Sequence, residues 1–204
     1  MITIVDYGVG NVKSIQNMLK RMGEETITSK SESEIKSATK IILPGVGAFD
    51  YGMTQLKKSG LIPLLNQKVL EEKIPTLGIC LGAQMLGKKS DEGEEPGLGW
   101  IDMDIVRFDS SKMKHNLKIP HMSWNEINIK KDSPLLLDLD DESRFYFVHS
   151  YHMLPKDNND ILCVSNYGYE FISGVSKNNI YGVQFHPEKS HKFGMKLLEN
   201  FSKI

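Results

Sequence analysis

The fold is decided by the stretch Thr76-Leu-Gly-Ile-Cys-Leu-Gly-Ala-Gln-Met-Leu86, which joins a buried strand to a helical run. Its first four residues form a short apolar segment of the kind found in parallel sheets, and residues 84–86 are helical in character. Between them, Gly78-Ile-Cys-Leu-Gly82 places a cysteine between glycines where the strand ends. Small residues on both sides permit a strained turn that exposes the side chain, as in a nucleophile elbow. The stretch therefore predicts a strand, a tight turn and a helix, with a reactive thiol at the turn.

The residues before this stretch alternate short apolar runs with amphipathic segments. In the first amphipathic segment apolar side chains recur at helical spacing, and Gly23 closes it. Such alternation predicts βα units around a parallel sheet. The predicted elements are strands at residues 2–5 and 40–43, a helix at 12–22, and a helix at 56–72 that is interrupted near Gly60 and Pro63.

From about Trp100 the pattern changes to strands, and only the last segment, residues 192–201, returns to helix. No repeat, low-complexity tract or linker separates the two halves, so we expect residues 1–204 to form one domain with a three-layer α/β fold. The predicted strands of the second half are residues 101–108, 126–129, 145–148, 161–166, 171–175 and 180–185.

Composition excludes several classes of partner. The chain has 204 residues, of which 40% are hydrophobic and 25% charged, as in ordinary globular proteins. Because 25 basic residues balance 26 acidic ones, no global field attracts nucleic acid or an anionic membrane. The apolar run at the N-terminus is too short for a signal peptide and no segment approaches the length of a membrane span, so we expect a cytoplasmic protein.

The two cysteines, Cys80 and Cys163, are expected to be reduced thiols with different roles. Cys163 lies inside the apolar run Ile161-Leu-Cys-Val164, which indicates a buried structural residue. Glycines around Cys80 would be costly in a packing site, and the start of a following helix favours a thiolate. Cys80 is therefore the candidate nucleophile.

A cysteine nucleophile requires a base, and His186 is the best candidate among six histidines. It follows a strand, and Glu188 stands two residues on, where a carboxylate can orient the imidazole. His149 and His152 are rivals whose spacing also suggests metal ligation. On a strand, however, residues three apart point to opposite faces, so a local hydrogen-bonding role is favoured over a metal site. His115 is expected to be a solvated loop residue.

Two glycine-rich turns follow predicted strands. Pro44-Gly-Val-Gly47 stands where an open α/β sheet places its ligand crevice, so its backbone either approaches a substrate or forms a plain tight turn. Tyr7-Gly-Val-Gly-Asn11 carries only part of a dinucleotide fingerprint, and no nucleotide binding is inferred from it.

Taken together, Gly78-Ile-Cys-Leu-Gly-Ala-Gln84 and His186-Pro-Glu188 resemble the motifs of class I glutamine amidotransferases. Further stretches are similar to the glutaminase subunits of imidazole glycerol phosphate synthases, and this resemblance covers essentially the whole chain. These stretches are Asp6-Tyr-Gly-Val-Gly-Asn11, Pro44-Gly-Val-Gly-Ala-Phe49, Pro120-His-Met-Ser-Trp-Asn125 and His186-Pro-Glu-Lys-Ser190. The resemblance implies the family's three-layer fold with a central, mostly parallel sheet.

The resemblance also implies a mechanism in which a Cys-His-Glu triad releases ammonia from glutamine. Cys80 would attack the carboxamide, His186 would transfer protons, and Glu188 would orient His186. The backbone N–H of Leu81 and, after a reorientation of the 44–47 strand, that of Val46 would hold the oxyanion.

Further roles come from matching positions. The implied glutamine-binding residues are Gly47, Gln84, Glu92, Ser150 and Tyr151, with Glu92 facing the ammonium group or, alternatively, belonging to a solvated acidic loop. The family partner is a (β/α)8-barrel cyclase of histidine biosynthesis, in a heterodimer contacted by Asn11, Trp124 and Lys189. The resemblance implies no cofactor and no metal.

Several features leave alternatives open. Ser123 and Ala83 depart from the family pattern, which usually has glycine and a larger apolar residue there. Gly97-Leu-Gly-Trp-Ile101 and His191-Lys-Phe-Gly194 are similar to paralogues that supply ammonia for amidino groups on surface sugars. A cysteine hydrolase or peptidase acting alone, and a non-enzymatic scaffold of the same fold, are alternatives of other classes.

Overall fold

The computed structural model describes residues 1–113 and 117–204, and it is built around a sheet with a parallel core. His115 lies outside the described residues. Five neighbouring strands run parallel in the order β2-β1-β3-β4-β13. Their bounds are β1 Ile2–Val5, β2 Thr26–Ser29, β3 Lys40–Gly45, β4 Thr76–Cys80 and β13 Ile180–Val183. The three strands predicted in the first half, at residues 2–5, 40–43 and 76–79, are confirmed as β1, β3 and β4, whereas β2 was not predicted.

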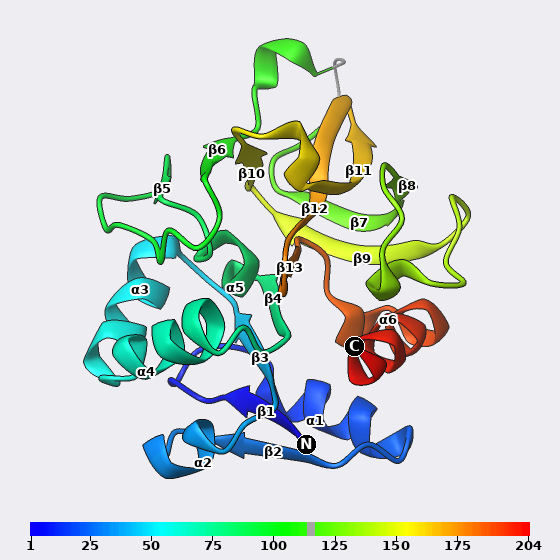
Figure 1. Ribbon diagram of the computed structural model, residues 1–204. Coiled ribbons are helices and arrows are strands. Elements are labelled where there is room, and N and C mark those ends of the chain that lie inside the picture. The colour runs from blue at the N-terminus through cyan, green and yellow to red at the C-terminus, as the bar shows by residue number, and fades with distance from the viewer. Residues whose placement is uncertain (114–116) are drawn as a thin grey trace.

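Helices cover both faces of this parallel core (Figure 1). Alternate strand residues point to opposite faces, so Ile42 joins one buried cluster while Ile41 and Leu43 join another. The first cluster includes side chains of α1 and α6, and the second includes side chains of α3 and α4. The predicted three-layer α/β class is confirmed.

The helices differ in detail from their prediction. The predicted helix at residues 56–72 is broken around Gly60, as expected, but it starts earlier, at Phe49, and its last turn is a π-helix at Gln67–Glu71. Pro63 lies in the first turn of α4, where a missing N–H has no cost. The α-helices are α1 Val12–Arg21, α2 Glu32–Lys36, α3 Phe49–Lys58, α4 Ile62–Asn66, α5 Leu81–Gln84 and α6 His191–Lys203. None in the described residues is long and apolar enough to cross a membrane.

The second half of the chain extends the same sheet with antiparallel strands. β13 pairs with β12, which pairs with β10 and β11, and β10 leads through β6 to β5. Short 3₁₀ turns lie at Ser110–Lys112, Pro134–Leu136, Asn158–Asp160 and Pro187–Lys189. The strand bounds are β5 Lys89–Ser90, β6 Met103–Arg107, β8 Asn128–Ile129, β10 Tyr151–Pro155, β11 Ile161–Tyr167 and β12 Tyr169–Lys177.

One pair of strands stands apart from this sheet. β7 (His121–Glu126) pairs only with β9 (Arg144–His149), as an antiparallel two-stranded sheet. The second half therefore does not contribute all of its strands to the main sheet. The strand predicted at residues 126–129 spans the last residue of β7 and the whole of β8, and the rest of β7 was not predicted. β7 was missed because its side chains are mostly polar and exposed.

Glycines allow β3 and the turn after β4 to pack backbone to backbone. A Cβ on Gly82 would lie 1.9 Å from the Leu43 carbonyl oxygen, and one on Gly45 would lie 2.7 Å from the Gly82 nitrogen. Both separations are far below van der Waals contact, so any side chain here would force β3 away from the turn. The close approach fixes the position of Cys80 relative to the sheet.

We expect Gly82→Ala to lower the free energy of unfolding by about 3 kcal/mol or more, because β3 must move to admit the methyl group. Gly60→Ala is the matched control, since its Cβ would meet no atom within 4 Å and only the positive φ of 73° opposes it. That substitution should cost about 1 kcal/mol. Urea unfolding measures both values, and equal losses would contradict the packing described for Gly82.

Candidate active site

Cys80 occupies a strained turn at the carboxyl end of β4. Its backbone has φ 54° and ψ −113°, a conformation that costs energy for any residue with a Cβ. β4 ends at Cys80 and α5 begins at the next residue, so no loop absorbs the change of direction. The predicted elbow is confirmed. Because α5 is only four residues long, the turn offers Sγ first-turn N–H groups but little macrodipole.

His186 and Glu188 lie together beside this turn. Nδ1 of His186 is 2.8 Å from Oε1 of Glu188, and both side chains are almost fully buried. The backbone of His186 is held in place, because its N–H donates to the Tyr146 carbonyl and its own carbonyl accepts from Ser190 Oγ. The predicted orienting contact between carboxylate and imidazole is present.

The other ring nitrogen of His186 lies on the side of Cys80. Nε2 is buried and forms no regular hydrogen bond within the described residues. Burial by itself would lower the pKa of His186, but the neighbouring Cys80 thiol and the Glu188 carboxylate outweigh it and raise the pKa to about 10. Burial, with a smaller contribution from Cys80, also raises the pKa of Tyr7 well above its usual value. The arrangement favours an imidazolium beside the sulfur.

A cavity of about 740 Å³ opens onto Cys80 and His186. The cavity is lined by all residues predicted to bind glutamine or to hold the oxyanion. It is also lined by the residues predicted to contact the partner, apart from Trp124. Glu188 lies behind His186 and does not line the cavity. The predicted residues in the lining are Asn11, Val46, Gly47, Cys80, Leu81, Gln84, Glu92, Ser150, Tyr151, His186 and Lys189.

Glu92 has a definite place in this wall. Its Oε2 accepts a hydrogen bond of 2.9 Å from the Phe49 N–H at the start of α3, and the residue is half-buried. A carboxylate is stabilised at a helix N-terminus. The carboxylate of Glu92 is therefore held against the start of α3, and its contact with glutamine stays a prediction.

The Pro44 to Gly47 turn contributes Val46 and Gly47 to the lining of the cavity. The Tyr7 hydroxyl donates to the Pro44 carbonyl at 2.6 Å, while Val46 is 42% exposed and Gly47 has φ 94°. The turn is thus anchored at its first residue and free at its third, which favours the close-approach interpretation over a plain tight turn.

Comparison with known proteins identifies the family. The model of the class-I glutamine amidotransferases matches residues 3–204. The chain belongs to this family.

Relatives of this amidotransferase cover its full length. It is 53% identical over 204 residues to the imidazole glycerol phosphate synthase subunit HisH 2 of Pseudomonas aeruginosa, with both chains fully covered. A protein of the same name from Methanococcus maripaludis is 54% identical, covering 100% of this chain and 99% of its own. The HisH subunit of Leptospira interrogans is 45% identical with full coverage.

Solved structures support the amidotransferase fold. A crystal structure described as a glutamine amidotransferase superposes with a TM-score of 0.73 at 17% identity, covering 100% of this chain and 99% of the other. PurLQS from Thermotoga maritima gives a TM-score of 0.72 at 19% identity, with coverage of 98% and 96%. At these low identities the two structures support the fold and nothing about function.

In the amidotransferase, His149 and His152 are buried together. Both rings contact Phe108, whose ring centroid is 5.1 Å from that of His149 and 4.9 Å from that of His152. The expectation that the two histidines point to opposite faces is therefore wrong. The reason is a break at Ser150, between β9 and β10. Each ring hydrogen-bonds locally as predicted, His149 Nδ1 with the Tyr151 carbonyl at 2.8 Å and His152 Nε2 with the Tyr169 hydroxyl at 3.2 Å.

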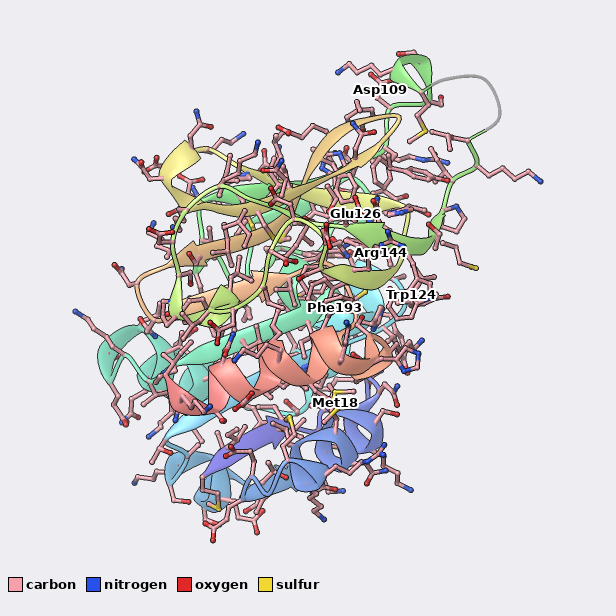
Figure 2. The ribbon with its side chains drawn as sticks, turned by 90° about the vertical axis from the view of Figure 1, so that its right-hand side faces the viewer. Met18, Asp109, Trp124, Glu126, Arg144 and Phe193 are labelled. Carbon is pink, nitrogen blue, oxygen red and sulfur yellow. The ribbon has the colours of Figure 1, made fainter. Side chains whose placement is uncertain are left out.

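Trp124 lies outside the cavity, on the exposed face of β7. It is 43% exposed and stacks in parallel on His191 at the start of α6, with centroids 5.4 Å apart (Figure 2). Lys189 reaches from the cavity towards the same side, with Nζ 5.4 Å from the centre of the Tyr146 ring. The Tyr146 ring thus lies near both Lys189 and Trp124, with its centroid 6.3 Å from that of the indole.

Sequence reasoning missed Gln184. This residue is fully buried immediately after β13, at the level of Cys80 on the neighbouring strand. A signal was available, because Gln184 is the one amide side chain in the apolar run that leads to His186.

The histidine pKa values predict opposite titrations. We expect His186 to keep its proton through neutral pH and to lose it only as the pH rises towards 10, because Cys80 and Glu188 favour the charged ring. His149 is an internal control: burial lowers its pKa to about 3, so it should stay neutral above pH 5. Histidine-selective NMR measures both.

The variant Glu188→Gln should move the titration of His186 to lower pH, since it removes a negative charge that raises this pKa. A midpoint near 6.5 in the unsubstituted protein would contradict the proposed charge state.

Proposed function

We propose that this amidotransferase hydrolyses glutamine to glutamate and ammonia through a thioester on Cys80. The observation that carries the proposal is the position of Cys80, which is held at positive φ on the wall of a cavity that His186 also lines, with Glu188 bonded to His186 from behind. Packing alone gives no reason for a strained thiol to face a buried imidazole. Nucleophilic catalysis requires this arrangement.

The chemistry follows from the three side chains. Sγ of Cys80 attacks the carboxamide carbon, and His186 gives its proton to the departing nitrogen, so ammonia leaves and a glutamyl thioester remains. His186 then accepts a proton from water as that water attacks the thioester, and glutamate is released. Nδ1 of His186 donates its proton to Oε1 of Glu188, with 2.8 Å between the two atoms. This hydrogen bond keeps Nε2 directed at the reacting atoms.

Two backbone N–H groups are proposed to hold the oxyanion. Leu81 is the first residue of α5, so its N–H has no partner within the helix. Val46 lies in the free part of the Pro44 to Gly47 turn, and a rotation there would bring its N–H towards the same point. The Tyr7 bond to the Pro44 carbonyl would act as the fixed end of that movement.

Glutamine would be held by the cavity wall. Oε1 of Glu92 is proposed to meet the ammonium group, and Gly47, Ser150 and Tyr151 the remaining polar atoms. Gln84 uses both hydrogens of its amide on Tyr151 and Gln184, so it offers a ligand its carbonyl oxygen.

We propose that the ammonia passes to a (β/α)8-barrel cyclase in a cytoplasmic heterodimer. The relatives above 40% identity carry the name of an imidazole glycerol phosphate synthase subunit, which supports a place in histidine biosynthesis, where the cyclase makes imidazole glycerol phosphate and aminoimidazole carboxamide ribotide. Asn11 and Lys189 at the cavity mouth and the exposed Trp124 are proposed to contact the cyclase. Residues 1–204 are proposed to form a single glutaminase domain.

A second acceptor is favoured by a specific observation. Both relatives above 50% identity are named HisH 2, and His191, in the stretch similar to surface-sugar paralogues, stacks on Trp124 at the proposed partner face. An amidotransferase for surface sugars could therefore use the same glutaminase. A cysteine hydrolase acting alone would need no such face.

Replacement of Cys80 by alanine should abolish glutamate release, by roughly 10⁴-fold or more, because no other thiol faces His186. Cys163→Ala is the matched control, since that thiol is fully buried and contacts Ser173 instead. Coupled glutamate assays with the partner measure both, and circular dichroism verifies folding. Residual turnover by a folded Cys80→Ala protein would show that the nucleophile is misassigned.

The acceptor is tested by mixing the chain with a barrel cyclase and, separately, with a sugar amidotransferase from the same cell, each with and without its own substrate. We expect low glutaminase activity alone and strong stimulation by the cyclase. Stimulation only by the sugar enzyme would overturn the pathway and keep the glutaminase. Full activity of the isolated chain would contradict coupling to any partner.

A further inference from the structure

Gln184 extends the strand next to β4 and reaches the back of the nucleophile. β13 pairs in parallel with β4, with Val183 opposite Ile79, so Gln184 stands level with Cys80. Its side chain is fully buried, and its backbone N–H donates to the Ser173 carbonyl at 2.9 Å. Nε2 of Gln184 lies 3.8 Å from Cys80 Sγ, within the range for an N–H···S hydrogen bond.

A chain of hydrogen bonds fixes which end of this amide faces the sulfur. The Tyr151 carbonyl can only accept, so the group beside it on Gln84 must be the NH₂ group, at 3.1 Å. The same NH₂ group donates to Oε1 of Gln184, also at 3.1 Å. With its oxygen thus engaged, Gln184 turns its own NH₂ group to Cys80. The Tyr151 carbonyl therefore sets the direction of the hydrogen bond from Gln184 to Cys80 Sγ.

We propose that Gln184 is a catalytic hydrogen-bond donor to the Cys80 sulfur, which stabilises the charge that returns to Sγ when the thioester breaks down. The proposal rests on the proposed role of Cys80 as nucleophile. It assigns to a buried amide a hydrogen bond to sulfur that acts in addition to the charge of the His186 imidazolium.

The step at issue is the second half of the reaction. Water adds to the thioester carbon while its proton moves to His186. The C–S bond then breaks and its electron pair passes to Sγ, so glutamate leaves and a thiolate forms. An N–H group directed at sulfur stabilises this product more than the neutral thioester, and so it lowers the barrier to breakdown. In the first half the same hydrogen bond raises the fraction of thiolate but lowers the nucleophilicity of that thiolate, and because the two effects oppose each other we expect little net change in the rate of attack.

The test measures thioester formation and breakdown separately in the protein with its activating partner. Labelled glutamine is mixed with excess enzyme, the reaction is quenched in acid at intervals, and peptide mass spectrometry follows the adduct on Cys80. Gln184→Met keeps an unbranched side chain of similar size but has no donor. We expect roughly tenfold slower breakdown, little change in formation, and a higher thioester occupancy.

A second variant keeps the proposal testable if the methionine variant does not fold. Gln184→Glu retains the oxygen that accepts from Gln84 and replaces the NH₂ group by oxygen. A protonated acid can still donate to sulfur and an ionised one cannot, so breakdown should be near normal at low pH and slow as the pH rises relative to the unsubstituted protein. A side chain that only fills space would show no such additional pH dependence.

Ser173→Ala is the matched control, because the buried Ser173 hydroxyl bonds to Ser165 and to the Cys163 thiol on the adjacent strand and has no hydrogen bond to Cys80 Sγ. It should leave thioester breakdown unchanged. Breakdown rates of Gln184→Met or Gln184→Glu within twofold of the unsubstituted protein at all pH values would overturn the role of Gln184. Absence of any adduct on Cys80 in the unsubstituted protein would instead overturn the proposed function, and this inference with it.

Discussion

The backbone contact between Gly82 and the Leu43 carbonyl is the constraint on which the site depends. Because no Cβ intervenes, the turn after β4 lies directly against β3, and this leaves Cys80 at φ 54°. The same contact lies next to the pairing of Gly45 with Cys80, so the Pro44 to Gly47 turn enters the cavity beside Cys80. Nucleophile and proposed oxyanion turn are thus positioned by a single packing interaction.

Burial has opposite consequences for the histidines around this turn. His186 has the Glu188 carboxylate and the Cys80 sulfur beside it, which raise its pKa, whereas burial, with smaller contributions from the neighbouring histidines, lowers the pKa of His149 to about 3. One ring is suited to exchange protons with a substrate, and the other to hold the Tyr151 carbonyl through a fixed tautomer. The Tyr151 carbonyl also accepts a hydrogen bond from Gln84, so His149 and Gln84 are held by the same backbone acceptor.

The sequence was sufficient for features that depend on neighbours along the chain. The elbow at Cys80 and the pairing of His186 with Glu188 are local, and the parallel half follows from apolar runs between glycines. Features that depend on distant pairing were not predictable: the β7–β9 sheet, the bond from Phe49 to Glu92, and the contact of Gln184 with Sγ. Each joins segments whose own patterns give no sign of the other.

The central claim is that the strained thiol at position 80 is the group that reacts with glutamine. The glutamine analogue 6-diazo-5-oxonorleucine carries a diazoketone in place of the carboxamide. A site that binds its amino-acid portion brings this group to the nucleophile, which is then alkylated. Peptide mapping by mass spectrometry after labelling should find one adduct, on Cys80, and saturating glutamine should protect against it. Labelling of Cys163 or of another residue, or labelling of Cys80 that glutamine does not slow, would contradict the account.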